Sequence, residues 1–285
     1  MNQTERAMFE TLKAARDHGV IAVKAEFEAE GTRSDELLRL LEIARRADLG
    51  VGLKIGGCEA VRDLIEARQF GVDYVIAPMV ETPYALSKYV AAKDKVFARD
   101  EQADTRFLFN VETRYAFGHL DEIGAKAEVG RVGMVFGRVD FAGSMGFKRD
   151  FVNSDEMTRY VVEVAEEARR RGVELVVGGG VNPEAIEPLR RVREVRLDRF
   201  ETRKVIFDAA VLDGRDAARG MELAIAFELD WLRNKRDFYG MIAGEDLSRI
   251  AMMEARQAAI PDEAQAVHVA GTHTGPLVAP RSAVA

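Results

Sequence analysis

The sequence predicts an α/β protein of the (β/α)8 TIM-barrel type, with an atypical or missing first strand and extra C-terminal helices. Three observations favour this fold. Short apolar runs alternate with helical periods along most of the 285 residues, which is typical of a parallel sheet covered by helices. The runs are apolar throughout, as expected for strands buried on both faces. The first strand–helix unit lacks a Gly-x-Gly-x-x-Gly turn, so a barrel is favoured over an open dinucleotide-binding sheet.

The strands and helices follow from these two periodicities. Strands are expected at the apolar runs 19–27, 51–56, 73–80, 106–111, 132–137, 174–179 and 194–197. Helices are expected at 34–47, 58–70, 82–93, 154–172 and 182–192, and an amphipathic pattern at 1–19 precedes the first strand.

The eighth strand is ambiguous. Residues 203–211 are apolar enough for a strand, but they follow 194–197 too closely for a covering helix between parallel strands. This segment either fills the vacant place in the barrel or begins a helix.

We expect three parts along the chain. Residues 1–212 form the catalytic barrel, and residues 213–258 form a helical extension in which a long helix is followed by a second one at 245–257. Residues 259–285, rich in Ala, Val, Pro and Gly without a period, are expected to be a disordered tail.

The extension also predicts self-association. Leu223, Phe227 and Trp231 recur at four-residue spacing and form an apolar stripe that is costly to leave in water. We expect a homo-oligomer, at least a dimer, in which the stripe packs on a neighbouring barrel. Packing on the chain's own barrel is the alternative.

Composition narrows the class of protein. The hydrophobic share of 47% suits a large core, and a net charge of -7 argues against a nucleic-acid partner. The single cysteine excludes an internal disulfide and fits a reducing compartment. Because no apolar run is long enough to cross a bilayer, we expect a cytoplasmic protein that does not bind membranes.

Two acids follow neighbouring predicted strands. Glu112 comes directly after 106–111, and Asp140 lies just beyond 132–137. In a parallel barrel both positions lie at the end that carries the active site. Adjacent carboxylates repel each other unless a proton or a cation is shared, and oxygen ligands suit Mg²⁺ or Mn²⁺. We therefore predict a metal pair; helix capping or pairing with a nearby arginine is the alternative.

Three motifs in order carry a resemblance to a known family. The stretches "YVIAPMVET", "FNVETRYAFGHLDEI" and "VGMVFGRVDFAGSMG" resemble the HpcH/HpaI aldolase and citrate lyase-like family, within the phosphoenolpyruvate/pyruvate-type barrels. The similarity covers roughly residues 19–200. It implies a barrel enzyme that makes or breaks a carbon–carbon bond next to a 2-oxo acid or a thioester.

The resemblance also implies roles for individual residues. Glu112 and Asp140 would hold the divalent metal. The backbone leading into that aspartate, at Gly137, Arg138 and Val139, would bind the carboxylate of a small anionic oxo-acid substrate.

The chain departs from the family at other positions. The Gly-Glu-His segment that supplies the family's base is "VKAEFEAEG" here, so Glu26 or Glu28 is the candidate replacement. The family's substrate-binding arginine is matched by Lys54, which would neutralise a carboxylate or the developing oxyanion; a Schiff base on Lys54 is the metal-independent alternative. The family's proline in the Asp motif is Arg138.

Further charged residues are candidates for the substrate. Lys24 and Glu26 point to the same face of the first strand and form either a buried ion pair or a proton-transfer pair. Arg199, Glu201 and Arg203 gather near the last predicted strand, where they would bind an anionic substrate or form a solvated salt-bridge network.

The leading hypothesis is a class II-like aldolase, a lyase that cleaves or forms a bond next to a 2-oxo acid through a metal-stabilised enolate. One alternative is a CoA-thioester lyase of the citryl- or malyl-CoA type. Another is a barrel that has lost catalysis and serves as a binding scaffold, which the missing histidine would explain.

Overall fold

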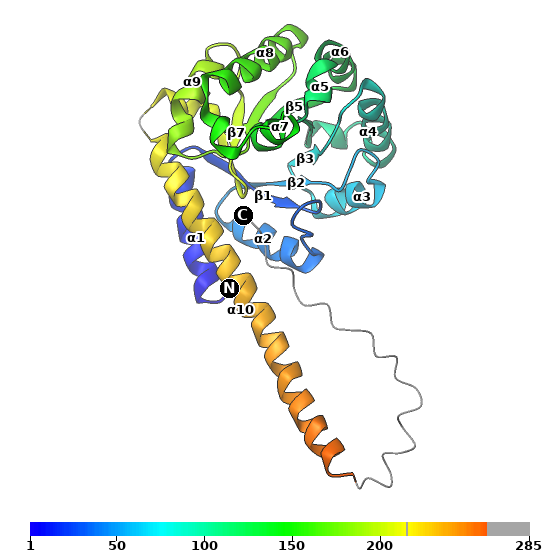
Figure 1. Ribbon diagram of the computed structural model, residues 1–285, viewed down its shortest axis with the longest axis vertical. Helices are drawn as coiled ribbons and strands as arrows, with labels where there is room; N and C mark the ends of the chain where they lie inside the picture. Colours follow the sequence, from blue (N-terminus) through cyan, green and yellow to red (C-terminus); the bar gives the residue numbers. More distant parts are fainter. Residues whose placement is uncertain (215, 261–285) are drawn as a thin grey trace. The chain divides into compact units, whose positions relative to one another are not determined.

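Eight strands form a closed barrel in the computed structural model, which describes residues 1–214 and 216–260 (Figure 1). Each strand pairs with its neighbours in chain order, and β1 pairs with β8 to close the ring. The strands are β1 (Val20–Glu26), β2 (Gly50–Lys54), β3 (Tyr74–Ala77), β4 (Arg106–Val111), β5 (Gly133–Gly137), β6 (Leu175–Gly178), β7 (Arg199–Glu201) and β8 (Val205–Asp208).

The last strand runs against the others. β1 to β7 are mutually parallel, whereas β8 is antiparallel to both β7 and β1. The turn between β7 and β8 is closed by a hydrogen bond from the Thr202 N–H to the Val205 carbonyl at 3.0 Å. So short a link allows only a hairpin, and a hairpin requires antiparallel strands. Residues 203–211 therefore supply the missing strand rather than the start of a helix.

The seventh strand is not where the sequence predicted it. Residues 194–197 form a turn and loop after helix α9 (Ile186–Arg193), and β7 occupies Arg199–Glu201 instead. Arg199 and Glu201 are charged but buried. Their charges interrupt the apolar pattern that predicts a strand. The two side chains can nevertheless be buried, because each is neutralised by a partner distant in sequence.

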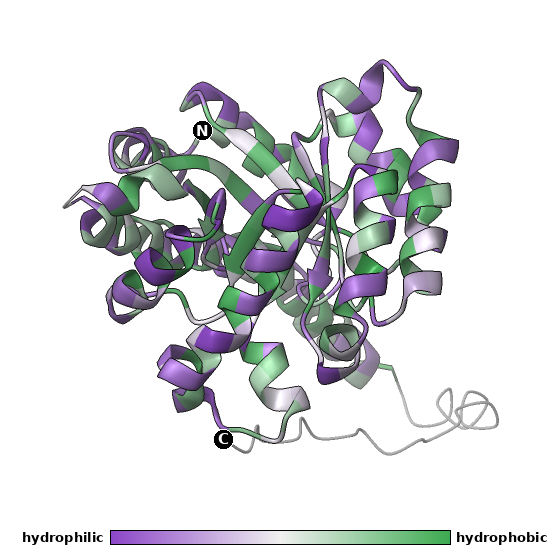
Figure 2. Ribbon diagram, turned by 90° about the horizontal axis from the view of Figure 1, so that it is seen from above, coloured by the Kyte–Doolittle hydropathy of each residue, from purple (hydrophilic) through white to green (hydrophobic). Residues whose placement is uncertain are grey.

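Helices surround the barrel and cover the outer face of its strands (Figure 1). Apolar residues are concentrated on the strands and on the helix faces that pack against them (Figure 2). The helices are α1 (Gln3–Arg16), α2 (Ser34–Arg46), α3 (Val61–Phe70), α4 (Pro83–Val96), α5 (Arg114–Gly118), α6 (Leu120–Gly130), α7 (Arg138–Ser144), α8 (Asp155–Arg171), α9 (Ile186–Arg193) and α10 (Ala217–Ala258).

A separate small core fills the middle of the barrel. Ile76, Leu108, Val135 and Val176 are each at most 2% exposed and pack together, with Tyr74 against them. These side chains come from four consecutive strands, as in the layered interior of other parallel barrels. They separate a charged layer at the C-terminal ends of the strands from another at the N-terminal ends.

At the N-terminal end of the barrel, Arg199 is held by Glu174. Their closest atoms are 2.8 Å apart, and the Arg199 guanidinium lies 4.9 Å from the ring centroid of Tyr74. Arg199 therefore lies at the end opposite the predicted site, and the expectation that it clusters with Arg203 is wrong. Burial alone would raise the pKa of Glu174, but the hydrogen bond and charge of Arg199 outweigh it and lower that pKa.

The Glu174→Gln variant should be destabilised by about 3 kcal/mol at pH 7, because it leaves a buried arginine without its counter-charge. A lowered pKa adds stability at higher pH that is lost as pH falls through the folded-state pKa. The difference from the wild-type protein should therefore shrink below pH 4.5, the ordinary value for glutamate. Urea unfolding at both pH values checks this. Glu187→Gln, which removes an exposed acid 3.7 Å from Arg190, should change little at either pH.

The helix α10 is continuous over 42 residues, so the predicted break before 245–257 is wrong. The chain divides into two compact units, Met1–Leu232 and the remainder from Arg233. Within the first unit, Phe227 and Trp231 are buried against the chain's own barrel. The apolar stripe is thus satisfied without a second subunit.

Other apolar side chains of α10 remain exposed in the described part of the chain. They are Ile225, Leu229, Leu232, Phe238, Met241, Ile242, Leu247, Ile250, Met252 and Met253. Self-association through 213–258 stays a prediction that now depends on these residues. Most of the predicted tail, 261–285, lies outside the described residues. Among the described helices, none is both long and apolar enough to cross a membrane.

Candidate functional site

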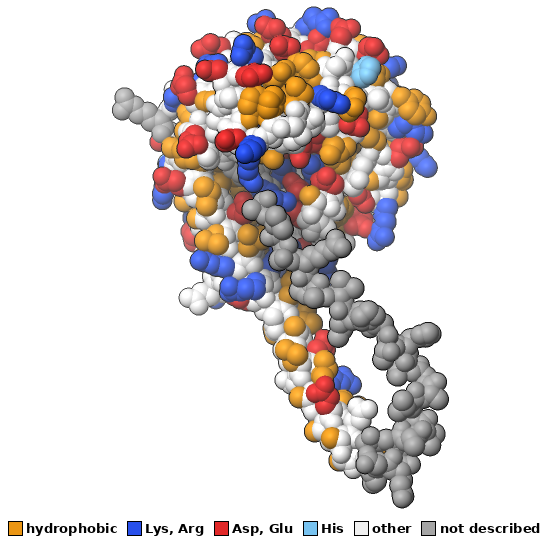
Figure 3. Space-filling model, viewed as in Figure 1, with side chains coloured by type: hydrophobic (Ala, Val, Ile, Leu, Met, Phe, Trp, Pro, Cys, Tyr) orange, Lys and Arg blue, Asp and Glu red, His pale blue; other side chains and the backbone are white. Residues whose placement is uncertain are grey.

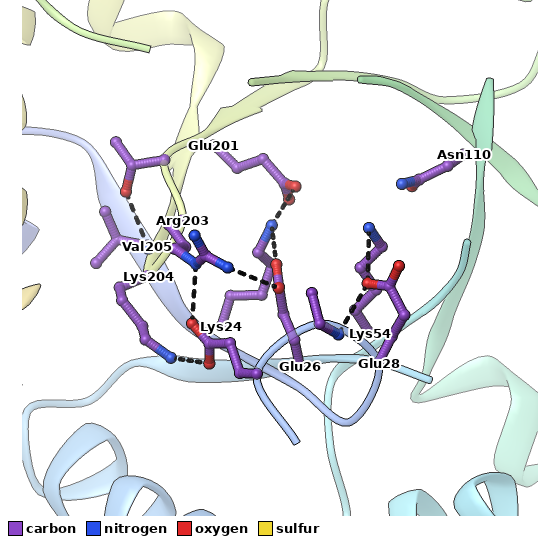
Figure 4. Close-up of polar contacts among 12 residues, drawn as sticks. Lys24, Glu26, Glu28, Lys54, Asn110, Glu201, Arg203, Lys204 and Val205 are labelled. Atoms are coloured by element: carbon purple, nitrogen blue, oxygen red, sulfur yellow. Dashed lines mark hydrogen bonds and ion pairs between the residues drawn. The ribbon is translucent and has the colours of Figure 1, made fainter. Parts of the chain in front are cut away.

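Polar side chains gather at the C-terminal ends of the strands, where parallel barrels carry their active sites. We call this region the barrel mouth. Its members are Lys24, Glu26, Glu28, Lys54, Asn110, Glu112, Asp140, Glu201 and Arg203, with the backbone that follows β3, β5 and β6. Figure 4 shows all of these side chains except Glu112 and Asp140, which it does not label.

Glu112 is the most firmly held acid of the mouth. Its side chain is 2% exposed, and its two oxygens accept hydrogen bonds from the Met79 N–H (2.9 Å) and the Asn110 amide (2.6 Å). Lys54 Nζ lies 4.0 Å from Oε2. Burial raises the pKa of Glu112, and the charge of Asp140 adds to this, against the lowering effect of Lys54 and the two hydrogen bonds.

The Met79 backbone is strained where it contacts Glu112. Its φ is +51°, a left-handed conformation that residues with a side chain rarely adopt. Such strain is typical of functional sites, because surrounding contacts must maintain it. Here the N–H that donates to Glu112 belongs to the strained residue itself.

Asp140 complements Glu112. It lies in the first turn of α7, its side chain is exposed, and within the described residues no hydrogen bond or ion pair engages its carboxylate. Gly137, at the end of β5, packs closely against Glu112, which follows β4, because a Cβ on Gly137 would lie only 2.8 Å from Oε2 of Glu112. One rigid and one open carboxylate suit a hard divalent cation.

The donor set fits Mg²⁺ or Mn²⁺ rather than a softer metal. The described residues contain no group of three or more His, Cys, Asp and Glu side chains placed to share an ion. Two carboxylates leave most octahedral positions to waters and substrate, as Mg²⁺ prefers.

Lys54 and Glu28 form the ion pair nearest to Glu112. Their closest atoms are 3.2 Å apart, and Lys54 lies between the two acids. Glu28 is partly open to solvent, with 28% of its side chain exposed. Figure 4 shows both side chains in the mouth, near Asn110.

Lys24 is committed to a buried triad with Glu201 and Glu26, at 2.5 and 3.5 Å. Burial would lower the pKa of Lys24, but the two carboxylates outweigh it and raise that pKa. Arg203 lies at the edge of this triad, 3.9 Å from Glu26 and 3.1 Å from Glu30. Of the alternatives left open for Lys24 and Glu26, the structure therefore displays the buried ion pair.

The predicted carboxylate-binding backbone lies at the start of α7. Glycine is required opposite it, because a Cβ on Gly179 would lie 2.7 Å from the Val139 nitrogen and 3.0 Å from that of Arg138. The Arg138 side chain itself is buried away from solvent. Its guanidinium donates to the Gly178 and Val152 carbonyls and to the Asn153 side chain.

Sequence reasoning missed Asn110 and Met79, and it grouped Glu201 with Arg199 and Arg203 rather than with Lys24. Asn110 was detectable, because it lies two residues before Glu112 and so shares its face of the strand. The pairing of Glu201 with Lys24 spans 177 positions and has no local signal. Neither described histidine reaches the mouth: His18 precedes β1 and lies 3.9 Å from Asp216, and exposed His119 precedes α6.

Comparisons with known proteins agree with this architecture. The family model described as HpcH/HpaI aldolase/citrate lyase matches residues 17–187. No curated protein matches the sequence. Among solved structures, an HpcH/HpaI aldolase from Desulfitobacterium hafniense DCB-2 has a TM-score of 0.56 at 15% identity, covering 72% of this chain and 84% of its own.

Two further structures have the same fold. An HpcH/HpaI aldolase/citrate lyase family protein from Burkholderia cenocepacia J2315 has a TM-score of 0.55 at 16% identity, with 82% and 90% covered. The citrate synthase SbnG has a TM-score of 0.54 at 15% identity, with 80% and 90% covered. The family model spans more than half of the chain. This chain belongs to the HpcH/HpaI aldolase/citrate lyase family.

Proposed function

We propose that this chain is a divalent-metal-dependent carbon–carbon lyase of the aldolase type, acting on a small 2-oxo acid. The observation that carries the proposal is the pair at the ends of β4 and β5. Glu112 is buried and held by two donors, whereas Asp140 is exposed and unpaired among the described residues. Glu112 and Asp140 would hold Mg²⁺ or Mn²⁺, which supplies a Lewis acid for the 2-oxo group and its enolate.

Glu28 is the best-placed base for the family's missing histidine. In the cleavage direction it would accept the proton of the hydroxyl group beside the breaking bond, and the electron pair of that bond would pass into the enolate of the 2-oxo acid. Glu26 is less suited, because Lys24 and Arg203 both lie within 4 Å of it. Among the described residues, Lys54 is the one cationic partner of Glu28.

Lys54 would act as a fixed positive charge. Its position between Glu28 and Glu112 lets it steady the carboxylate that gains the proton and balance negative charge that develops on the substrate oxygen. An ammonium group in two ion-pair contacts supports this role better than that of a Schiff-base nucleophile.

The substrate carboxylate would lie against the backbone from Gly137 to Val139, as the family resemblance implies. Arg203 is more than half exposed and would add charge at the edge of the mouth, whereas Lys24 is already neutralised by Glu201.

On the face shown in Figure 3, basic and acidic side chains of the barrel are interspersed. That mixture suits a small-molecule substrate better than nucleic acid. A cytoplasmic location and a homo-oligomer remain part of the proposal.

Metal titration tests the proposal. Calorimetry should detect Mg²⁺ or Mn²⁺ binding to the wild-type protein, and Glu112→Gln or Asp140→Asn should weaken it at least ~100-fold by removing a charged ligand. Glu10→Gln, which changes an exposed acid on α1, should bind metal normally. Unchanged metal affinity in both site variants would end the proposal.

A further inference from the structure

Arg138 is a buried arginine with no counter-charge in the described part of the chain. Its side chain is 2% exposed, and within residues 1–214 and 216–260 no carboxylate pairs with it. Its donors reach neutral acceptors only: the Gly178 carbonyl at 3.3 Å, the Val152 carbonyl at 3.4 Å and the Asn153 side chain at 3.2 Å. The remaining terminal nitrogen, Nη2, has no acceptor in the described protein.

Such an arrangement is unfavourable for folding. An ionised group in apolar surroundings loses its hydration, and neutral acceptors replace only part of it. The side chain of Arg138 is surrounded by residues that include Met157, Val161, Val177 and Leu189, and the cavity beside it has a volume of only about 10 Å³. Arginine keeps its proton in proteins at neutral pH, so the side chain is cationic there. Stability alone would favour an apolar residue at this position.

The charge lies directly behind one wall of the mouth. Arg138 holds the carbonyl of Gly178, the last residue of β6, and two glycines with left-handed backbones follow it, Gly179 at φ +80° and Gly180 at +67°. In the described structure the N–H groups of Gly179 and Gly180 have no hydrogen-bond acceptor. They are free donors next to the Val139 backbone.

We propose that the Arg138 side chain is a positioning and specificity residue that makes the Gly178–Gly180 wall of the mouth select a carboxylate. It fixes the turn through the Gly178 carbonyl and adds positive charge behind the free N–H donors. The inference rests on the proposed function and deepens it, because it adds this wall, opposite the Val139 backbone, to the segment 137–139 as the place that receives the anionic end of the substrate. The charge is a departure of this chain from the family motif, which has proline here.

Oxalate, a planar dicarboxylate that mimics the enolate of a 2-oxo acid, is the probe. Calorimetry at saturating Mg²⁺ should show oxalate binding about tenfold weaker in Arg138→Met, because an anion loses a charged neighbour. Arg138→Gln, which retains a donor but not the charge, should lose as much. Arg138→Lys should remain within about threefold of the wild-type protein. Arg62→Met, at an exposed arginine paired with Glu66, is the matched control.

Two further readouts separate this role from a structural one. Mg²⁺ affinity should stay within about twofold in Arg138→Met, and its melting temperature should not fall, because an unpaired buried charge has been removed. Unchanged oxalate affinity in Arg138→Met or Arg138→Gln overturns the inference alone. The inference is also overturned if the affinities for Mg²⁺ and for oxalate fall together in both variants, because that result indicates a structural role. A wild-type protein that binds Mg²⁺ but not oxalate overturns the inference together with the oxo-acid part of the proposed function.

Discussion

The metal-dependent turnover of the Gly137→Ala variant is expected to be at least ~100-fold lower than that of the wild-type protein. A loss of this size is typical when a group of the active site, here Glu112, is displaced by about 1 Å. The added Cβ would lie 2.8 Å from Oε2 of Glu112 and 3.0 Å from its Cβ. Glu112 cannot give way easily, because Met79 and Asn110 hold its two oxygens in a buried position. Overpacking should also destabilise the fold by about 2 kcal/mol.

The matched control lies six residues further along the chain. Gly137 ends β5, and Gly143 lies in α7 directly after it, where a Cβ meets nothing within 4 Å. Because Gly143 is helical, Gly143→Ala should be neutral or stabilise by up to about 1 kcal/mol. Metal titration and thermal unfolding of both variants provide the comparison. Normal metal binding in Gly137→Ala would mean that Glu112 is not a ligand.

Lys54→Met should lower kcat by about 10³-fold while the protein stays folded, because it removes the charge between Glu28 and Glu112. The pKa of Glu112, already raised by burial, should rise further without Lys54. The assay is turnover of pyruvate or oxaloacetate with a panel of aldehydes in the presence of Mg²⁺, with loss on addition of EDTA as the metal control.

Lys54→Arg distinguishes the two roles considered for this lysine. A fixed-charge role predicts that arginine restores activity to within about tenfold of the wild-type protein. A Schiff base predicts that arginine is as inactive as methionine and that EDTA has no effect. Lys88→Met, which removes a partly exposed lysine 2.8 Å from Glu59, should leave kcat unchanged. Full activity in Lys54→Met would remove Lys54 from the mechanism altogether.

The candidate metal pair was predictable because it depends on local order. Glu112 and Asp140 each follow an apolar strand, and consecutive strands of a parallel barrel are neighbours with their C-terminal ends together. Counting residues therefore placed the two acids side by side. The family match over 17–187 agrees with this reading of the central strands.

The last part of the barrel was less predictable because its strands do not follow the apolar rule. β7 contains Arg199 and Glu201, whose burial depends on Glu174 and Lys24. An apolar pattern cannot reveal a charge that is neutralised by a residue on another strand. The antiparallel direction of β8 relative to its neighbours could not be predicted either, because an apolar run has the same pattern in a parallel and in an antiparallel strand.

The sequence by itself determined the barrel class, the order of its first six strands and the two acids at the mouth, because periodicity and strand order are local properties. Tertiary structure alone decided the partners of the charges. It placed Lys24 against Glu201 and Lys54 between two acids, and it left Arg138 without a counter-charge from any residue that the structure describes. It also buried Trp231 on its own barrel rather than on a neighbour. Each of these outcomes depends on which side chains, distant in sequence, become neighbours in the buried interior, where the dielectric constant is low. They become neighbours only when the strands close into a barrel.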